Sequence, residues 1–161
     1  MAYQKLQTSA ALDVIPSNTV PIPDRATKVL DGTADFSVAG TLTDVGTTFL
    51  SAGIQKNAIV YNITDQKAYF VLDVTDDLNL SITSIAGGSA AAKYYIYNAP
   101  TNGCVLYVGT GGTVAVQFSE PTDNAFGESL FKNVPDASFL PIQAVRVDDT
   151  QTTASDIIAL W

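Results

Sequence analysis

The chain has 161 residues, 47% of them hydrophobic and 15% charged, which excludes a disordered chain and allows one medium domain or two small ones. Eight basic and sixteen acidic residues give a formal charge of −8, and the basic residues are scattered, so we expect no nucleic-acid partner. No apolar run approaches the roughly 20 residues that cross a bilayer, and residues 1–7 lack the pattern of a signal peptide. We therefore expect a soluble protein without a membrane partner, made in a cytoplasm.

The first 25 residues predict an extended N-terminal arm. Pro16, Pro21 and Pro23 exclude both a helix and a central strand in this stretch. The stretch is nevertheless too apolar for a free tail, so we expect it to pack along its own domain or along a neighbouring subunit. An ordinary edge strand with proline-rich loops is the alternative.

The rest of the chain is rich in β-branched residues, which favour strands. Period-2 alternation, interrupted by turn residues, predicts strands over 58–63, 68–74, 78–83, 93–98, 103–108, 114–118, 140–147 and 156–161. We expect hairpin turns at 75–77 and 109–112. The single helical prediction is a short turn over 44–52 that Asp44 would cap. The sequence thus predicts an all-β fold, a sandwich or barrel.

Two of these strands are apolar on both faces, which indicates that each is covered on both sides. They are 104–108 and 157–161, and the second cover is either another β layer or a neighbouring subunit. A large aromatic as the last residue, Trp161, suggests a docked terminus. The arm and the last strand therefore supply the candidate interface residues, which are Tyr3, Leu6, Leu12, Ile15, Val20, Ile22, Ile158, Leu160 and Trp161.

Five tyrosines fall in the middle of the chain, and they allow two interpretations. Tyr61, Tyr69, Tyr94, Tyr95 and Tyr97 could form an aromatic platform for sugars or for a protein. Aromatic residues at period 2 in a strand are more often part of the core. Asn62-Ile-Thr64 matches a glycosylation acceptor but carries little weight without a secretory signal.

Reactive groups are scarce in this sequence. The absence of His excludes serine–histidine and cysteine–histidine nucleophiles and ordinary zinc sites, and Cys104 stands alone, so no internal disulfide forms. The glycines of 109–112 lack the following helix that a phosphate-binding loop needs. The aspartates at 73–77 and 148–149 lack EF-hand spacing. We expect no catalytic residues, no cofactor and no metal, although a pair of aspartates for glycoside hydrolysis stays open because sequence separation does not report distance.

Four segments, taken together and in order, resemble a known family. They are Tyr3-Gln-Lys-Leu-Gln with Val14-Ile-Pro-Ser-Asn-Thr-Val-Pro-Ile-Pro, then Gly103-Cys-Val-Leu-Tyr-Val-Gly-Thr-Gly-Gly, then Phe131-Lys-Asn-Val-Pro-Asp-Ala-Ser-Phe-Leu-Pro, and finally Thr152-Thr-Ala-Ser-Asp-Ile-Ile-Ala-Leu-Trp. The combination resembles the spike base protein family of tailed phages and gene-transfer agents, and related virion structural proteins. The resemblance covers about 1–25 and 103–161, whereas residues 33–98 depart from the shorter members of the family.

The resemblance implies a β-structured, non-enzymatic virion subunit. On this basis we expect residues 1–32 and 99–161 to form one discontinuous domain and residues 33–98 a small barrel-like insert. The expected role is capsid decoration, cement or spike base. The subunit would form a trimer or pentamer on the capsid exterior, contacting the major capsid protein and, where a fibre is present, a head fibre protein. The alternative is a receptor- or glycan-binding module of a phage tail or fibre.

Overall fold

A computed structural model describes residues 8–84, 87–119 and 128–161 of the chain. The described residues form twelve strands in two six-stranded antiparallel sheets and one short 3-10 helix, Arg25–Thr27, which confirms the prediction of an all-β fold. They include no helix with the length and hydropathy needed to cross a bilayer. The chain divides into two compact units: unit 1 contains the chain up to Val14 together with Asn102–Trp161, and unit 2 contains Ile15–Thr101.

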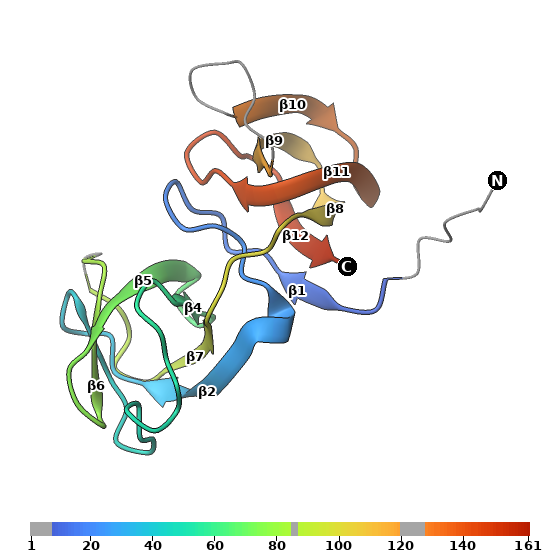
Figure 1. Cartoon of the computed structure of the whole chain (residues 1–161). Helices are drawn as coiled ribbons and strands as arrows, with labels where there is room; N and C mark the ends of the chain where they lie inside the picture. The colour runs from blue at the N-terminus through green and yellow to red at the C-terminus, as the bar shows by residue number, and fades with distance from the viewer. Residues whose placement is uncertain (1–7, 85–86, 120–127) are drawn as a thin grey trace. The chain divides into compact units, whose positions relative to one another are not determined.

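Unit 1 is built on an open sheet in which the strand nearest the N-terminus and the strand nearest the C-terminus lie side by side (Figure 1). Its strand order is β1-β12-β8-β11-β9-β10. The strands are β1 (Ala11–Asp13), β8 (Cys104–Thr110), β9 (Gly112–Phe118), β10 (Glu128–Val134), β11 (Ser138–Val147) and β12 (Ser155–Leu160). The chain terminus is fixed by hydrogen bonds in both directions, because the Trp161 amide donates to the Ala10 carbonyl at 3.1 Å and the Ser9 amide donates to the Trp161 carbonyl.

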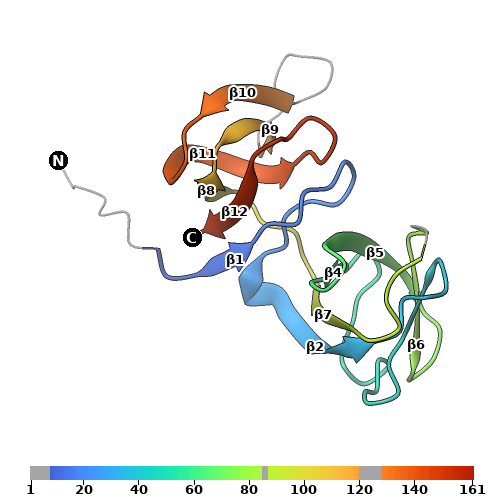
Figure 2. The ribbon, with the colours of Figure 1, turned by 180° about the vertical axis from the view of Figure 1, so that it is seen from behind.

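Unit 2 is a sheet that curls until its edge strands meet (Figure 2). Its order is β2-β7-β4-β5-β6-β3. The strands are β2 (Lys28–Ala34), β3 (Thr41–Thr43), β4 (Ile59–Asn62), β5 (Lys67–Val74), β6 (Asn79–Ile82) and β7 (Ala92–Tyr97). Asp35, which follows β2, exchanges two backbone hydrogen bonds with Thr43 of β3, at 2.8 and 3.0 Å. This bridge joins the two edges, as in a small barrel.

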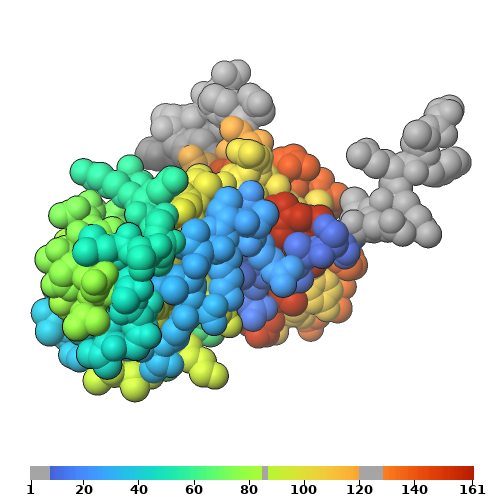
Figure 3. Space-filling model, turned by 60° about the horizontal axis from the view of Figure 1, so that its bottom comes forward, coloured from blue at the N-terminus to red at the C-terminus, as the bar shows by residue number. Residues whose placement is uncertain are grey.

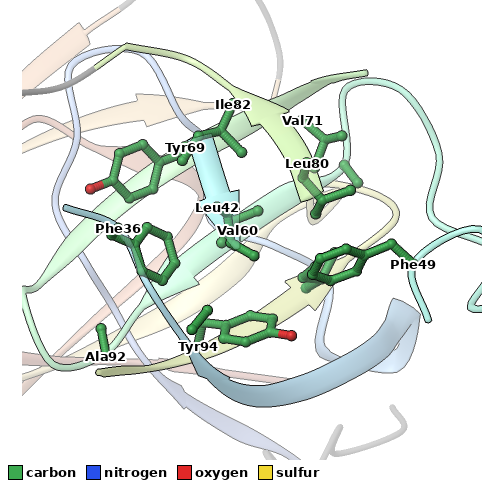
Figure 4. Close-up of a cluster of buried hydrophobic side chains, with 13 residues drawn as sticks. Phe36, Leu42, Phe49, Val60, Tyr69, Val71, Leu80, Ile82, Ala92 and Tyr94 are labelled. Carbon is green, nitrogen blue, oxygen red and sulfur yellow. The ribbon is translucent and has the colours of Figure 1, made fainter. Parts of the chain in front are cut away.

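The interior of unit 2 is filled by side chains that alternate along its strands, as period-2 burial requires (Figure 4). Phe36 lies at the centre of an aromatic group, 5.6 Å from the Tyr69 ring and 6.2 Å from the Tyr94 ring. Phe49, from the loop after β3, is also buried there. Aliphatic side chains of β3, β5 and β6, such as Leu42, Val71 and Leu80, complete this core.

The expected domain boundary at residues 32 and 33 is wrong, because β2 belongs to unit 2. Lys28–Ala34 pairs antiparallel with Ala92–Tyr97, which places the strand inside the sheet of the insert. The proline-rich stretch before it also belongs to this unit. The Thr101 amide donates to the Ile22 carbonyl at 2.8 Å, and the Asp24 amide donates to the Ala99 carbonyl at 3.0 Å. Residues 15–32 therefore belong to unit 2, and the predicted arm, residues 1–25, is divided between the two units.

Two local predictions also fail. Residues 44–52 form turns rather than a helix, since the Asp44 side chain accepts hydrogen bonds from the Gly46 amide and from Tyr94 on β7. Residues 109–112 are not a hairpin turn, because β8 and β9 both pair with β11 and not with each other. Glycine is required at position 111, between β8 and β9, because a Cβ atom there would collide with the Val134 carbonyl. The turn at 75–77 does connect the paired strands β5 and β6.

A buried polar contact links the loop after β3 to the barrel wall. The Tyr94 hydroxyl donates a 2.7 Å hydrogen bond to Asp44 Oδ2, with Tyr94 fully buried and Asp44 nearly so. Burial, followed by the adjacent carboxylate, raises the pKa of Tyr94 far above its usual 10. Gly32, opposite Tyr94 in the neighbouring strand, leaves room for this pair, because a Cβ atom there would lie 2.7 Å from Asp44 Oδ2.

We expect Tyr94→Phe to lower the free energy of unfolding by about 1–3 kcal/mol, because it leaves a buried carboxylate oxygen without its donor. Urea unfolding followed by circular dichroism measures the change. Tyr95→Phe is the matched control, since Tyr95 is the next residue in β7 and is only half-buried. Equal stabilities for the two variants would show that the Tyr94–Asp44 contact does not fix the loop.

Candidate interaction surface

The two faces of the unit 1 sheet differ in burial although both are apolar. On one face Cys104, Leu106, Val108, Ile157 and Ala159 are all buried. Burial raises the pKa of the Cys104 thiol to about 12, and its Sγ lies 3.2 Å from the Ala144 carbonyl oxygen, so the thiol is a structural, unreactive group. The opposite face, which we call the outer face, carries Val105, Tyr107, Phe139, Ile158 and Leu160.

Strand pairing sets these five side chains next to one another. Tyr107 of β8 is paired with Ile158 of β12 on one side and with Phe139 of β11 on the other. The Tyr107 and Phe139 rings have centroids 5.2 Å apart. Val105 and Leu160 form the next pair along β8 and β12. Side chains paired in this way share one side of a sheet, so the five form a continuous apolar surface.

The outer face is partly exposed, with Phe139 at its most exposed point. Phe139 is 57% exposed, while the other four side chains are half-buried. The five residues carry no charge. Asp13, paired with Ile158, and Asp156, next to Gly109, lie at its margins. An uncharged aromatic and aliphatic surface with a polar margin has the composition of the centre of a protein interface.

The structure separates the nine predicted interface residues. Ile158 and Leu160 lie on the outer face, whereas Leu12 lies on the opposite, buried face of the same sheet. Ile15, Val20 and Ile22 are 2%, 2% and 1% exposed and offer no surface in this conformation. Trp161 is half-buried beside Ala10. Tyr3 and Leu6 lie outside the described residues.

Sequence reasoning missed Phe139, the most exposed member of the outer face. The predicted strand began at residue 140, whereas β11 begins at Ser138. Phe139 and Leu140 are adjacent and both apolar, so the alternation of apolar and polar residues does not identify Phe139, and Pro141 interrupts the strand pattern directly after them. A bulge between Leu140 and Ala144 accommodates the proline within the strand.

The tyrosine platform is not available on the surface of unit 2. Tyr61, Tyr69, Tyr94 and Tyr97 are all at most 2% exposed. Tyr69 and Tyr94 lie in the interior of the barrel, whereas Tyr61 and Tyr97 are buried on the other face of the sheet, with ring centroids 6.1 Å apart. Burial raises the pKa of Tyr97 to about 12. Tyr95 alone among the five is half-exposed, and the Lys28 ammonium lies 4.4 Å from its ring centroid. The core interpretation therefore holds for four of the five residues.

A second apolar group lies on the loop after β3, in the part of unit 2 coloured cyan to teal in Figure 3. Val45 and Leu50 are 83% and 62% exposed, and Leu78, from the facing turn, is 40% exposed. The Asp44 amide donates to the Leu78 carbonyl, which holds the loop and the turn together. Asp76 and Asp77 precede Leu78, so two acidic residues adjoin this group in the sequence.

Asp65 organises a polar cluster in unit 2. It accepts hydrogen bonds from the Ser89 amide at 2.8 Å, the Ser89 hydroxyl at 2.6 Å and the Asn62 amide group at 2.8 Å. Asn62 is fully buried, so the possible glycosylation acceptor is inaccessible in the folded chain. The cluster connects the turn after β4 to the segment before β7, a structural role.

No side-chain arrangement in the described ranges points to metal chemistry, since none of their residues form a group of three potential ligands from His, Cys, Asp and Glu.

Comparisons with protein-family models, with curated proteins and with solved structures find no match to the chain. The outer face of unit 1 is the candidate site because strand pairing joins its five apolar side chains into one partly exposed surface.

The Asp65 cluster predicts a specific dependence of stability on pH. The hydrogen bonds from the Ser89 amide and hydroxyl hold the pKa of Asp65 below its usual 3.8. A carboxyl whose pKa is lowered by folding stabilises the folded state above its unfolded pKa and loses that effect as the pH falls through the folded pKa. We expect Asp65→Asn to be less stable than the unmodified chain near neutral pH, with the gap closing in acid.

Urea midpoints measured from about pH 6 to about pH 2 test this expectation. Asp77→Asn, at an exposed aspartate of the same unit, is the control for general charge effects. A gap between Asp65→Asn and the unmodified chain that stays constant over the whole range would contradict the assignment.

Proposed function

We propose that the protein is a non-enzymatic virion structural protein, a capsid decoration, cement or spike-base subunit. In this proposal it assembles as a symmetric oligomer on the capsid exterior. The observation that supports it most is the outer face of unit 1, a continuous apolar surface of five side chains that the fold leaves partly exposed. Assembly requires such surfaces, and it does not require reactive side chains.

Three of the segments that resemble the spike base family lie in the unit that carries this surface. The segment 103–112 covers β8, the segment 131–141 runs from β10 into β11, and the segment 152–161 contains β12. These strands all belong to unit 1, and three of them, β8, β11 and β12, build the outer face. Three of the four segments that resemble spike base proteins thus fall in unit 1, which carries the candidate surface, whereas residues 15–23 of the first segment belong to unit 2.

The proposed partners are other copies of this chain and the major capsid protein, with a head fibre protein where a fibre is present. The acidic charge of −8 keeps free subunits apart until an uncharged surface brings them together. The glycan-binding alternative loses its tyrosine platform, because four of the five tyrosines are core residues. No other observation favours it.

The native mass of the purified chain, measured by light scattering over a dilution series, tests this proposal. We expect a trimer or pentamer that persists on dilution, because a closed ring buries one interface per subunit and leaves none open. A monomer at every concentration would contradict the proposed self-assembling subunit.

A further inference from the structure

We propose that the outer face of unit 1 is the surface through which copies of this chain contact one another, with Phe139 as its most exposed side chain. This inference rests on the proposed function and adds to it the surface and its occupant. The occupant is a second copy of the same chain. Charge, geometry and exposure each support that choice.

Charge favours a second copy over a charged partner. Copies of a chain with a formal charge of −8 repel one another wherever their acidic side chains meet. Near a symmetry axis identical residues of different copies approach each other, so a charged group there would be repelled by the same group of another copy. The five side chains of the outer face are uncharged, and the carboxylates of Asp13 and Asp156 lie at its margins.

The sheet geometry suits a contact in which the outer faces of neighbouring copies meet around the axis of a trimer or pentamer. Apolar side chains on a twisted sheet pack closely against another apolar surface, as the two layers of a β-sandwich do. Tyr107 and Phe139 are already held against each other, so little side-chain entropy is lost when the contact forms. Aromatic side chains such as Tyr107 often contribute a large share of the binding energy of an interface.

The exposed loop of unit 2 is a poorer self-contact. Val45, Leu50 and Leu78 are exposed there, but Asp76 and Asp77 directly precede Leu78. Two copies meeting through this loop would bring these carboxylates toward their equivalents. The loop therefore provides a control surface that also exposes apolar side chains and has a different expected outcome.

Phe139→Asp in the full-length chain tests the proposal. The substitution places a carboxylate at the most exposed position of the outer face, where it would approach the same carboxylate of another copy. We expect the concentration at which half of the chains are assembled to rise at least tenfold, as measured by light scattering or sedimentation. Val45→Asp introduces the same charge at an 83% exposed valine of unit 2, and we expect it to leave assembly unchanged.

Folding is monitored separately so that dissociation is not confused with unfolding. Phe139 is 57% exposed, so Phe139→Asp should keep the circular dichroism spectrum and a cooperative thermal transition. If it does not, Phe139→Ser removes the ring without adding charge and is assayed in the same way. Loss of assembly in a folded Phe139 variant, with Val45→Asp still assembled, supports the proposal.

Two results overturn it, and they differ in what they say of the proposed function. An unmodified chain that assembles, with Phe139→Asp assembling equally well or Val45→Asp dissociating to the same extent, rejects the outer face and leaves the oligomeric subunit standing. An unmodified chain that is monomeric at every concentration rejects both.

Discussion

The pairing of the last strand between the first strand and β8 is the constraint on which unit 1 depends. β12 uses both of its edges, one for β1 and the other for β8. Ala11 and Leu160 are paired although all of unit 2 lies between them in the sequence. Closing so long a loop has an entropic cost that grows only slowly with loop length, which explains why an inserted unit is tolerated. Without β1, the β12 strand would become an exposed edge.

This arrangement also produces the asymmetry between the two faces. Because side chains alternate along a strand, placing β12 beside β8 puts Ile157 and Ala159 on the buried side and Ile158 and Leu160 on the other. Both sets are apolar, so one face forms the core and the other is left as an apolar surface. In unit 2 the apolar side chains are covered in another way. Its sheet curls until Asp35 and Thr43 join its edges, and its alternating side chains fill a closed interior.

Local pattern predicted the strands well and their partners poorly. Alternation such as that of Leu80 and Ile82 is a local property, and it identified nearly every strand after residue 58. Pairing is a long-range property, so the sequence did not show that Lys28–Ala34 joins Ala92–Tyr97 or that β8 and β9 both flank β11. The turn over 44–52 failed for a related reason. The carboxylate of Asp44, which looked like a helix cap, is bound by Tyr94 from a strand fifty residues away.

The candidate surface was predictable in part. Apolar residues on both faces of 104–108 and 157–161 indicated that a second cover is needed, and the structure shows which side chains need it. The arm residues Ile15, Val20 and Ile22 were chosen because they are apolar. Apolar character alone does not distinguish a residue that the chain buries itself from one that it leaves for a partner. Phe139 lies next to Tyr107 only through the pairing of β11 with β8.

Chemical cross-linking at the outer face tests the central claim most directly. Phe139→Cys places a thiol on that face, and Cys104 is buried and should not react with an added bismaleimide. The account predicts covalently linked pairs of chains from Phe139→Cys and only single chains from Val45→Cys. If, at concentrations where the chain is assembled, Val45→Cys gave linked pairs and Phe139→Cys gave none, the outer face would not be the contact between copies.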